Sequence, residues 1–405
     1  MIPMQLKSDV LDRVTFLTGS ADLITQLSDV PAKIPFDDYI VEFLNDISKK
    51  IMENWAARVY SDVVTFAFWI RRSSVVKLKE RFGINDGSFH LGRGIVLHIA
   101  PSNVPVNFAY SMVTGLLTGN ANIVRVPSKG FPQVGIIVNA INSALEQNEA
   151  MRPYIHLIRY DRDKEINDLF SSIADVRVIW GGDKTIAELR KSPLPPRSGE
   201  ITFADRYSLA VIDSDSYLDI KDKERVAKDF YNDTFFSDQN ACTSPRVMIW
   251  TGESIEKAKK VFWETEHRLV EKKYTFQPIQ GINKLTSSYL IAATESGMSI
   301  EDRKDNLIVR VNVPEITESI MNYRDNSGYF YEYNCRDILE IKALCDDKRC
   351  QTIAYIGDGK AVLPLIKAGV RGIDRVVPMG KTMDFDLIWD GYNLPAHLTR
   401  TVVLE

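Results

Sequence analysis

The chain has 405 residues, of which 45% are hydrophobic and 26% are charged, and its formal net charge is −4. This length is enough for two domains, because a single hydrophobic core stops growing at roughly 250–300 residues. The composition is that of a globular protein, and the slightly acidic balance argues against a nucleic-acid binder, which needs a basic surface.

The first half of the chain changes from helical periodicity to an alternating pattern. Residues 38–85 carry apolar side chains at three- and four-residue intervals, which predicts a group of helices. From residue 94 onward, we expect strands over 94–100, 122–126, 154–160 and 176–181, and helices over 105–118, 131–147, 163–172 and 183–192. This alternation predicts βαβ units and a mostly parallel sheet that binds ligands at the carboxyl ends of its strands.

The second half repeats the α/β pattern after a proline-rich connection. The segment 192–200 cannot continue a helix, so we expect it on the surface. The runs after it predict strands over 208–215 and 246–250, helices over 223–236 and 254–274, and further strands within 307–313 and 351–357. We therefore predict an α/β fold with domains at 1–210 and 211–380, followed by a tail at 381–405 that packs back or aids oligomerisation.

The chain has no apolar run of the length that crosses a membrane, which is roughly 20 residues. Its first residues carry charges where a signal peptide needs an apolar core, so we expect a cytoplasmic protein. The four cysteines lack CxxC spacing and the five histidines are scattered, which predicts reduced thiols and no metal site. His98 lies within an apolar strand and is predicted to be a hydrogen-bonded core residue.

Three strand ends in the first half carry residues that suit a nucleotide. The segment 99–108 places an asparagine between two prolines, and 124–129 ends in basic and hydroxyl side chains. The segment 180–185, WGGDKT, has two glycines before a helix, whose N–H groups and dipole favour phosphate. Each segment alone also fits an ordinary turn or helix cap, but the strand ends of an open sheet converge on one crevice. Together they predict a nucleotide site.

The standard nucleotide signatures are absent. GRGIVL, residues 92–97, lacks a third glycine and precedes a strand, whereas the dinucleotide fingerprint follows one. MGKT, residues 379–382, resembles the end of a P-loop, but Arg375 stands where the first glycine belongs. We therefore do not expect ATP or GTP hydrolysis.

The segment SDQNACTSPR, residues 237–246, places Cys242 in a polar loop between a predicted helix and a predicted strand. A structural cysteine usually lies in an apolar run, as Cys345 does, whereas a reactive thiol needs access and polar or electropositive surroundings. The pattern alone leaves both interpretations open. At an ordinary pKa near 8.5 only about 3% of the thiol is ionised at pH 7, so a nucleophilic role requires activation or the intrinsic reactivity of sulfur.

In chain order, IAPSNVPVNF, GNANIVRVPSK, WGGDKT and DQNACTSPR resemble the landmarks of the aldehyde dehydrogenase superfamily. The likeness is more specific to the LuxC-type acyl-CoA reductases, the reductase component of bacterial fatty-acid reductase. It extends over AFWIRR at 67–72, over 103–129 and over 372–394, and covers most of the chain. The resemblance implies an aldehyde-dehydrogenase-like fold, with a Rossmann-type NAD(P)-binding domain within 1–210 and a catalytic domain within 211–380.

The resemblance also implies a reaction. Cys242 would attack an acyl thioester, expel coenzyme A or another carrier thiol, and hold an acyl group that NAD(P)H then reduces to an aldehyde. Asn103 and the backbone N–H of Cys242 would stabilise the oxyanion, although Asn103 also suits a helix cap. Hydrolytic aldehyde dehydrogenases have a water-activating glutamate in a Glu-Leu-Gly-Gly element; here Ala204 falls at that position, with Asp205 beside it. This difference favours reduction over oxidation to an acid.

The cofactor is assigned to the three strand ends by the same resemblance. The assigned residues are Ala100, Pro101, Ser102, Arg125, Val126, Pro127, Ser128, Lys129, Gly181, Gly182, Asp183 and Thr185. Val126 replaces the lysine of the family pattern, and Arg125 and Lys129 flank it. Because a cation there accommodates a 2′-phosphate, we predict NADPH, with NADH as the alternative.

Partners and alternative functions follow from the resemblance too. It suggests a long-chain acyl group, delivered by acyl-CoA, an acylated partner enzyme or a carrier protein, and a homo-oligomer. Two alternatives remain open: a non-acylating aldehyde dehydrogenase that oxidises an aldehyde to an acid, and an acyl-carrying protein without reductase activity. Trp389, Asp390 and Gly391 are interpreted as a turn that locks the tail onto the body.

Overall fold

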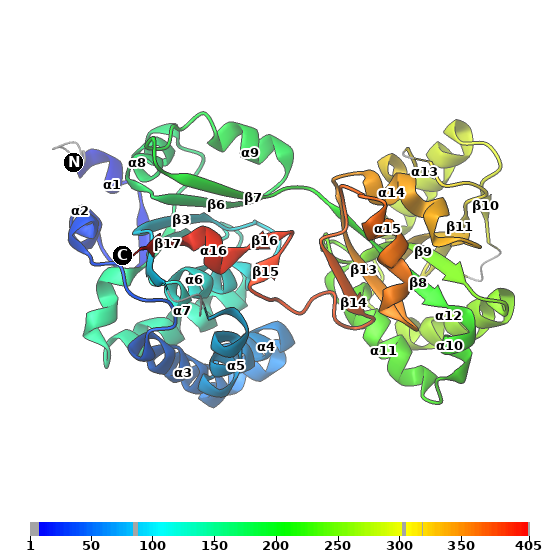
Figure 1. The fold of residues 1–405 in the computed structure, drawn as a ribbon, viewed down its shortest axis with the longest axis horizontal. Coiled ribbons are helices and arrows are strands. Elements are labelled where there is room, and N and C mark those ends of the chain that lie inside the picture. Colours follow the sequence, from blue (N-terminus) through cyan, green and yellow to red (C-terminus); the bar gives the residue numbers. More distant parts are fainter. Residues whose placement is uncertain (1–7, 84–87, 302–304, 318, 404–405) are drawn as a thin grey trace. The chain divides into compact units, whose positions relative to one another are not determined.

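The computed structural model describes residues 8–83, 88–301, 305–317 and 319–403. Parts of the predicted elements lie outside the described residues. They are 1–7, 302–304, 318 and 404–405 of the predicted domains and tail, and 84–85 of the predicted helical stretch. The chain divides into two compact units (Figure 1). Unit 1 comprises Met1–Ala204 and Asp386–Glu405, and unit 2 comprises Asp205–Phe385.

The predicted helices of the first 85 residues form a helical layer of unit 1. They are α3 (Asp38–Glu53), α4 (Ser61–Ile70) and α5 (Arg72–Phe82), with a 3-10 turn at Trp55–Val59. α3 begins at Asp37, whose carboxylate accepts from the N–H groups of Tyr39 and Ile40 and satisfies donors that the first helical turn leaves open. Short helices α1 (Ser8–Leu11) and α2 (Ala21–Thr25) precede them.

Within the described residues, the sheet of unit 1 has six strands in the order β1-β5-β4-β3-β6-β7. The predicted strands are β3 (Ile95–Ile99), β4 (Ala121–Arg125), β5 (Ile155–Arg159) and β6 (Val176–Trp180), joined by β7 (Gly199–Phe203) after the proline-rich loop. All five run parallel. The sequence pattern missed β1 (Thr15–Thr18), which is antiparallel to β5 at the edge.

Helices cover both faces of this sheet, as βαβ connections require. They are α6 (Asn107–Leu117), α7 (Pro132–Leu145), α8 (Lys164–Ile173) and α9 (Asp183–Leu189). In Figure 1, α6 and α7 lie on one face and α8 and α9 on the other, and the helical layer of α3 and α4 packs against α6 and α7.

His98 confirms its predicted core role. It is buried in β3, where its two ring nitrogens lie 2.7 Å from Ser111 Oγ and 2.9 Å from Asn122 Oδ1. Burial lowers the pKa of His98 to about 4, so the imidazole is neutral at pH 7 and both nitrogens are satisfied.

Of the predicted tail 381–405, the residues from Asp386 onward belong to unit 1, whereas 381–385 belong to unit 2. Strands β15 (Ile388–Trp389) and β16 (Tyr392–Asn393) form a hairpin whose turn, Asp390 and Gly391, has φ angles of 50° and 76°. After α16 (Leu394–Leu398), β17 (Thr399–Val402) pairs antiparallel with β2 (Phe89–Gly92). The turn interpretation of this motif therefore agrees with the backbone, because φ angles in this region are typical of tight hairpin turns.

The sheet of unit 2 has, in the part of the chain that the structure describes, seven strands in the order β10-β11-β12-β9-β8-β13-β14. They are β8 (Tyr207–Asp213), β9 (Pro245–Thr251), β10 (Ser299–Ile300), β11 (Val309–Asn312), β12 (Tyr329–Asn334), β13 (Cys350–Ile356) and β14 (Arg375–Pro378). Neighbouring strands are parallel except at β10.

Two separate apolar clusters cover the faces of this second sheet. Along β8, Leu209 and Val211 face one cluster while Ala210 and Ile212 face the other, as the two-residue period of a strand requires. α10 (Ser214–Asp219), α11 (Lys223–Asp233) and α12 (Ile255–Lys273) cover the second face, and α13 (Pro278–Thr294), α14 (Lys342–Asp346) and α15 (Leu363–Lys367) cover the first. Among the described residues, no helix combines the length and apolarity that a bilayer crossing needs.

Candidate active site

The Cys242 loop connects α11 to β9 in unit 2. After the 3-10 turn Phe235–Ser237, Asp238 and Gln239 both adopt left-handed backbone conformations, with φ angles of 52° and 57°, and reverse the chain. Cys242 is half-buried, whereas Cys335, Cys345 and Cys350 are buried. Of these four thiols, Cys242 is the one with access to solvent.

The side chain of Gln239 connects this loop to the sheet by hydrogen bonds. Its side chain is fully buried and donates to the carbonyls of Pro245 at 2.9 Å and Tyr329 at 3.1 Å. Its amide oxygen accepts from the N–H groups of Gly328 at 2.9 Å and Tyr329 at 3.1 Å. One side chain thus satisfies four backbone groups, which fixes the start of the loop that carries Cys242.

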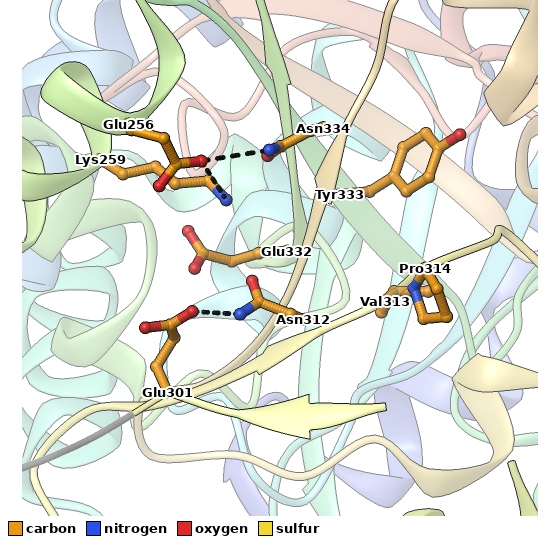
Figure 2. A pocket seen from close by; sticks show the side chains of 9 residues that line it. All are labelled: Glu256, Lys259, Glu301, Asn312, Val313, Pro314, Glu332, Tyr333 and Asn334. Carbon is orange, nitrogen blue, oxygen red and sulfur yellow. Dashed lines mark hydrogen bonds and ion pairs between the residues drawn. The ribbon is translucent and has the colours of Figure 1, made fainter. Parts of the chain in front are cut away.

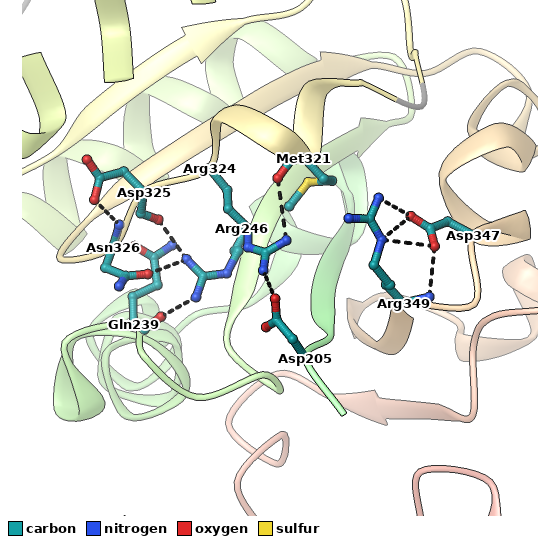
Figure 3. Close-up of polar contacts among 9 residues, drawn as sticks. All are labelled: Asp205, Gln239, Arg246, Met321, Arg324, Asp325, Asn326, Asp347 and Arg349. Atoms are coloured by element: carbon teal, nitrogen blue, oxygen red, sulfur yellow. Dashed lines mark hydrogen bonds and ion pairs between the residues drawn. The ribbon is translucent and has the colours of Figure 1, made fainter. Parts of the chain in front are cut away.

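Arg246 holds the other end of the loop (Figure 3). Its guanidinium donates to the carbonyl oxygens of Asp325 at 2.6 Å and Gln239 at 2.8 Å, and to Asn326 Oδ1 at 2.6 Å. The side chain is 6% exposed. No role for this arginine was predicted from the sequence, although its position four residues after the cysteine was a usable signal.

The charge of Arg246 interacts with that of Cys242. Burial, together with the nearby Arg324, lowers the pKa of Arg246 to about 10, whereas Asp205 and Cys242 act to raise it. Arg246 therefore stays protonated at pH 7, and a cation beside a thiol favours the thiolate form, the nucleophile. These are the electropositive surroundings that a reactive cysteine needs.

Neither of the two residues at the expected position of a water-activating glutamate offers an unpaired carboxylate. Ala204 ends the unit 1 segment and carries no ionisable group. Asp205 begins unit 2, and its carboxylate forms an ion pair with the guanidinium of Arg324 (Figure 3).

Asn103 lies in unit 1, in the exposed loop between β3 and α6. The helix cap is Val106 rather than Asn103, so the capping alternative for this asparagine is wrong. Ser102 beside it is also exposed, whereas Ala100 and Pro101 are half-buried and Ala100 N–H donates to the Arg125 carbonyl at 3.1 Å. The amide of Asn103 therefore faces solvent at the carboxyl end of a parallel strand.

The second strand end separates into buried and exposed residues. Val126 and Pro127 are buried, and the Val126 N–H donates to the carbonyl of Ile158 at 3.0 Å, so neither side chain is exposed to solvent. Ser128 and Lys129 are exposed.

The two cations that flank Val126 differ in their surroundings. Arg125 donates to the Tyr160 carbonyl at 3.1 Å and lies 4.4 Å from the centre of the Tyr160 ring. Lys129 is exposed and lies 5.1 Å from the centre of the Phe131 ring. Lys129 is thus the more available cation, because Arg125 is engaged by the protein itself.

The third strand end places Gly182 at the start of α9. A side chain there would meet no atom within 4 Å, so the space in front of this glycine is open. Gly181 N–H already donates to the Phe203 carbonyl at 3.1 Å, and Thr185 N–H donates to Gly182 O at 2.8 Å. Asp183 brings a carboxylate to the same helix end, where it competes with an anionic ligand for the helix dipole.

Unit 2 also contains a polar pocket of about 310 Å³ at the carboxyl ends of β11 and β12 (Figure 2). Its lining includes Lys259, Asn312 and Glu332. β12 residue Asn334 in this pocket pairs with Trp250 at the end of β9, whereas Cys242 precedes the start of β9. Cys242 precedes β9, as its place between a helix and a strand in the sequence indicates, and so lies at the amino edge of its sheet. Within the described residues, no three metal-ligating side chains form a candidate metal site.

Solved aldehyde dehydrogenases share this fold. The structure of lactaldehyde dehydrogenase from Escherichia coli matches with a TM-score of 0.61 and 13% identity over 90% of this chain and 86% of that one. An NAD-dependent benzaldehyde dehydrogenase from Corynebacterium glutamicum matches with a TM-score of 0.64 and 12% identity over 96% and 94%. The chain has an α/β, aldehyde-dehydrogenase-like fold, as predicted.

Comparison of the sequence with known proteins points to a more specific group than the aldehyde dehydrogenases. Residues 77–272 match the family model of acyl-CoA reductase (LuxC). The long-chain acyl-protein thioester reductase of Aliivibrio fischeri is 24% identical over 292 residues, which cover 71% of this chain and 58% of that protein. The reductase of the same name from Vibrio harveyi is 24% identical over 298 residues, with 71% and 59% coverage. The resemblance to the LuxC-type acyl-CoA reductases is confirmed, and the chain spans somewhat less than 60% of the length of these curated relatives.

Proposed function

We propose that this protein reduces a long-chain acyl thioester to the aldehyde through an acyl-enzyme on Cys242. The observation that carries the proposal is the thiol itself, accessible in a loop that Gln239 fastens and that the buried cation of Arg246 adjoins. The aldehyde-dehydrogenase-like fold and the match to acyl-CoA reductases support the reaction class.

The first half-reaction needs a thiolate and a thioester. Cys242 Sγ attacks the acyl carbonyl carbon, the bond from that carbon to the carrier sulfur breaks, and the carrier leaves as a thiol after it takes up the proton from Cys242. The backbone N–H of Cys242 and the Asn103 amide are the proposed donors to the oxyanion. With alanine at position 204 and Asp205 paired to Arg324, no group is assigned to activate water. The acyl-enzyme therefore persists until it is reduced.

The second half-reaction needs a nicotinamide cofactor, for which we propose NADPH. The open space at Gly182 fits a phosphate near the start of α9, and the exposed cation of Lys129 fits a 2′-phosphate. When bound, NADPH supplies the hydride that converts the acyl-enzyme into the aldehyde and returns the Cys242 thiolate.

The cofactor choice is tested by Lys129→Ala. We expect the ratio of kcat/KM with NADPH to kcat/KM with NADH to fall about tenfold, the effect of one lost charge-assisted hydrogen bond. Lys164→Ala, which removes another exposed lysine of unit 1, serves as the control and leaves the ratio unchanged. An unchanged ratio in both variants would contradict the assignment of the 2′-phosphate to Lys129.

The acyl donor is proposed from the names of the relatives, which are acyl-protein thioester reductases. We therefore propose an acylated protein as the physiological donor and acyl-CoA as a surrogate. We also propose a homo-oligomer, on the resemblance alone.

The decisive experiment is intact-protein mass spectrometry after incubation with tetradecanoyl-CoA, with and without NADPH. We expect the mass of one acyl group on Cys242, its loss when NADPH is added, and stoichiometric aldehyde. The control is Cys335→Ala, which removes a buried thiol and leaves the reaction intact. An acyl group that stays after NADPH addition indicates an acyl carrier, and thioester-dependent NADPH oxidation that survives Cys242→Ala shows that the nucleophile is wrong.

A further inference from the structure

The segment Met379–Phe385, MGKTMDF, is held by a buried carboxylate. Asp233, the last residue of α11, is fully buried. Its Oδ2 accepts from the Gly380 N–H at 2.6 Å, and its Oδ1 accepts from the Thr382 N–H at 3.1 Å. These backbone N–H groups, which resembled part of a phosphate-binding loop in the sequence, thus bind a carboxylate of the protein itself.

The close approach of α11 to the segment requires the glycine. Gly380 has a φ of +86°, and a Cβ atom at this position would lie 2.6 Å from the Cβ of Asp229, one helical turn before Asp233. The glycine therefore permits both the left-handed turn and the short distance at which Asp233 reaches the backbone.

An arginine holds the opposite side of the same segment. The Arg375 guanidinium donates to the carbonyls of Thr382 at 3.2 Å and Asp384 at 3.1 Å. Backbone donors are thus bound by Asp233 and backbone acceptors by Arg375. A segment without regular secondary structure is in this way fixed by two charged side chains.

The segment contacts the cysteine loop through Met383. The Thr243 hydroxyl, adjacent to Cys242, donates to the Met383 sulfur at 3.2 Å. Thr243 is buried, whereas Met383 is 37% exposed. Met383 therefore presents a flexible apolar side chain to solvent beside the residue that follows the thiol.

We propose that Asp233 is a positioning residue, which holds Met379–Phe385 against the Cys242 loop so that Met383 forms a wall beside the thiol. The inference rests on the proposed function of Cys242 as the acyl acceptor. Asp233 acts through the backbone of the segment, whose Gly380 and Thr382 N–H groups it binds. Its chemistry is that of an anion on two N–H donors, the strong class of hydrogen bond.

The ionisation of Asp233 falls in the physiological range. Burial raises the pKa of Asp233 to about 7, although the N–H groups of Gly380 and Thr382 lower it, and Asp384 raises it. The other charged groups that face it are Asp229 on its own helix and Lys381 on the segment, and Arg375 lies on the segment's other side. Above this pKa both carboxylate oxygens of Asp233 accept from the N–H groups of Gly380 and Thr382. Below it, the added proton on the carboxyl group weakens the contact between Asp233 and the segment.

The test is the rate at which iodoacetamide alkylates Cys242, measured by peptide mass spectrometry between pH 5.5 and 9. In the wild-type protein we expect the rate profile to bend near pH 7 as well as at the ionisation of the thiol. Asp233→Asn cannot titrate, so the bend near pH 7 disappears, and the rate at pH 8 rises about fivefold, the factor equivalent to one net hydrogen bond. The buried Cys335, Cys345 and Cys350 stay unmodified if the unit remains folded.

Two further variants complete the design. Asp229→Asn removes the same charge one turn earlier and keeps the wild-type profile, because that carboxylate accepts no hydrogen bond from the segment. Met383→Ala leaves Asp233 in place but removes the contact with Thr243, so it also loses the bend and raises the rate. An Asp233→Asn profile that superimposes on the wild type, or an equal effect of Asp229→Asn, overturns the inference. Alkylation needs no acyl substrate, so this result is independent of whether tetradecanoyl-CoA acylates Cys242.

Discussion

Gln239 offers a quantitative test of how the cysteine loop is built. Gln239→Met keeps the length of the side chain and removes all four of its hydrogen bonds to Pro245, Gly328 and Tyr329. A neutral hydrogen bond contributes about 1 kcal/mol net, and the freed backbone groups are buried. We therefore expect the free energy of unfolding of unit 2 to fall by about 4 kcal/mol, or about 2 kcal/mol if water replaces some partners.

The assay must report on unit 2, because a chain of two units does not unfold in one step. Pulsed alkylation of Cys345, which is buried in the core of unit 2, during a urea titration supplies this signal. Asn240→Ala is the matched control: the residue is adjacent but exposed, and its side-chain Oδ1 accepts from Asn326 Nδ2 at 2.7 Å at the surface. A Gln239→Met loss below about 1 kcal/mol, equal to that of the control, would refute the assignment of the loop's rigidity to this side chain.

Two further predictions concern the cores. Glu266 is fully buried, and neither carboxylate oxygen has a hydrogen-bond partner within the described residues; burial raises its pKa well above the ordinary value of 4.5. Glu266→Met should raise the stability of unit 2 by about 1–3 kcal/mol. Above pH 4.5 the folded wild type holds a proton on Glu266 that the unfolded chain releases, so wild-type stability falls as the pH rises. The stability gained by Glu266→Met should therefore grow between pH 5 and 8 in urea titrations. A gain in stability that shrinks as the pH rises contradicts the burial of a protonated Glu266. In unit 1, a Cβ on Gly115 would lie 1.8 Å from Asn122 Oδ1, so Gly115→Ala should cost about 2 kcal/mol, whereas Gly135→Ala, with no atom within 4 Å, should stabilise α7 by about 0.5–1 kcal/mol. Thermal unfolding that ranks the two variants in the opposite order would show that the packing argument fails.

The three segments predicted to bind the cofactor show what a strand pattern in the sequence can predict and what it cannot. The sequence predicted that 99–108, 124–129 and 180–185 follow parallel strands, and each does. It did not distinguish the buried Val126 from the exposed Lys129, because a residue just beyond a strand takes its environment from neighbouring strands. The availability of Arg125 was similarly decided by Tyr160, a residue of the next βα unit.

The sequence by itself indicated the alternation of helices and strands in the first half, the α/β class and the loop that carries Cys242, because periodicity and turn residues act over a few neighbouring positions. Tertiary structure alone decided the partners of that loop. Gln239 binds the start of β12 some 90 positions later in the chain, and Arg246 binds the turn before it. The MGKT segment is the clearest case. Its residues resemble the end of a P-loop, and Arg375 in place of the first glycine argues against one, but the sequence does not say what its N–H groups bind. The fold brings the buried Asp233 to them, a contact across 147 positions.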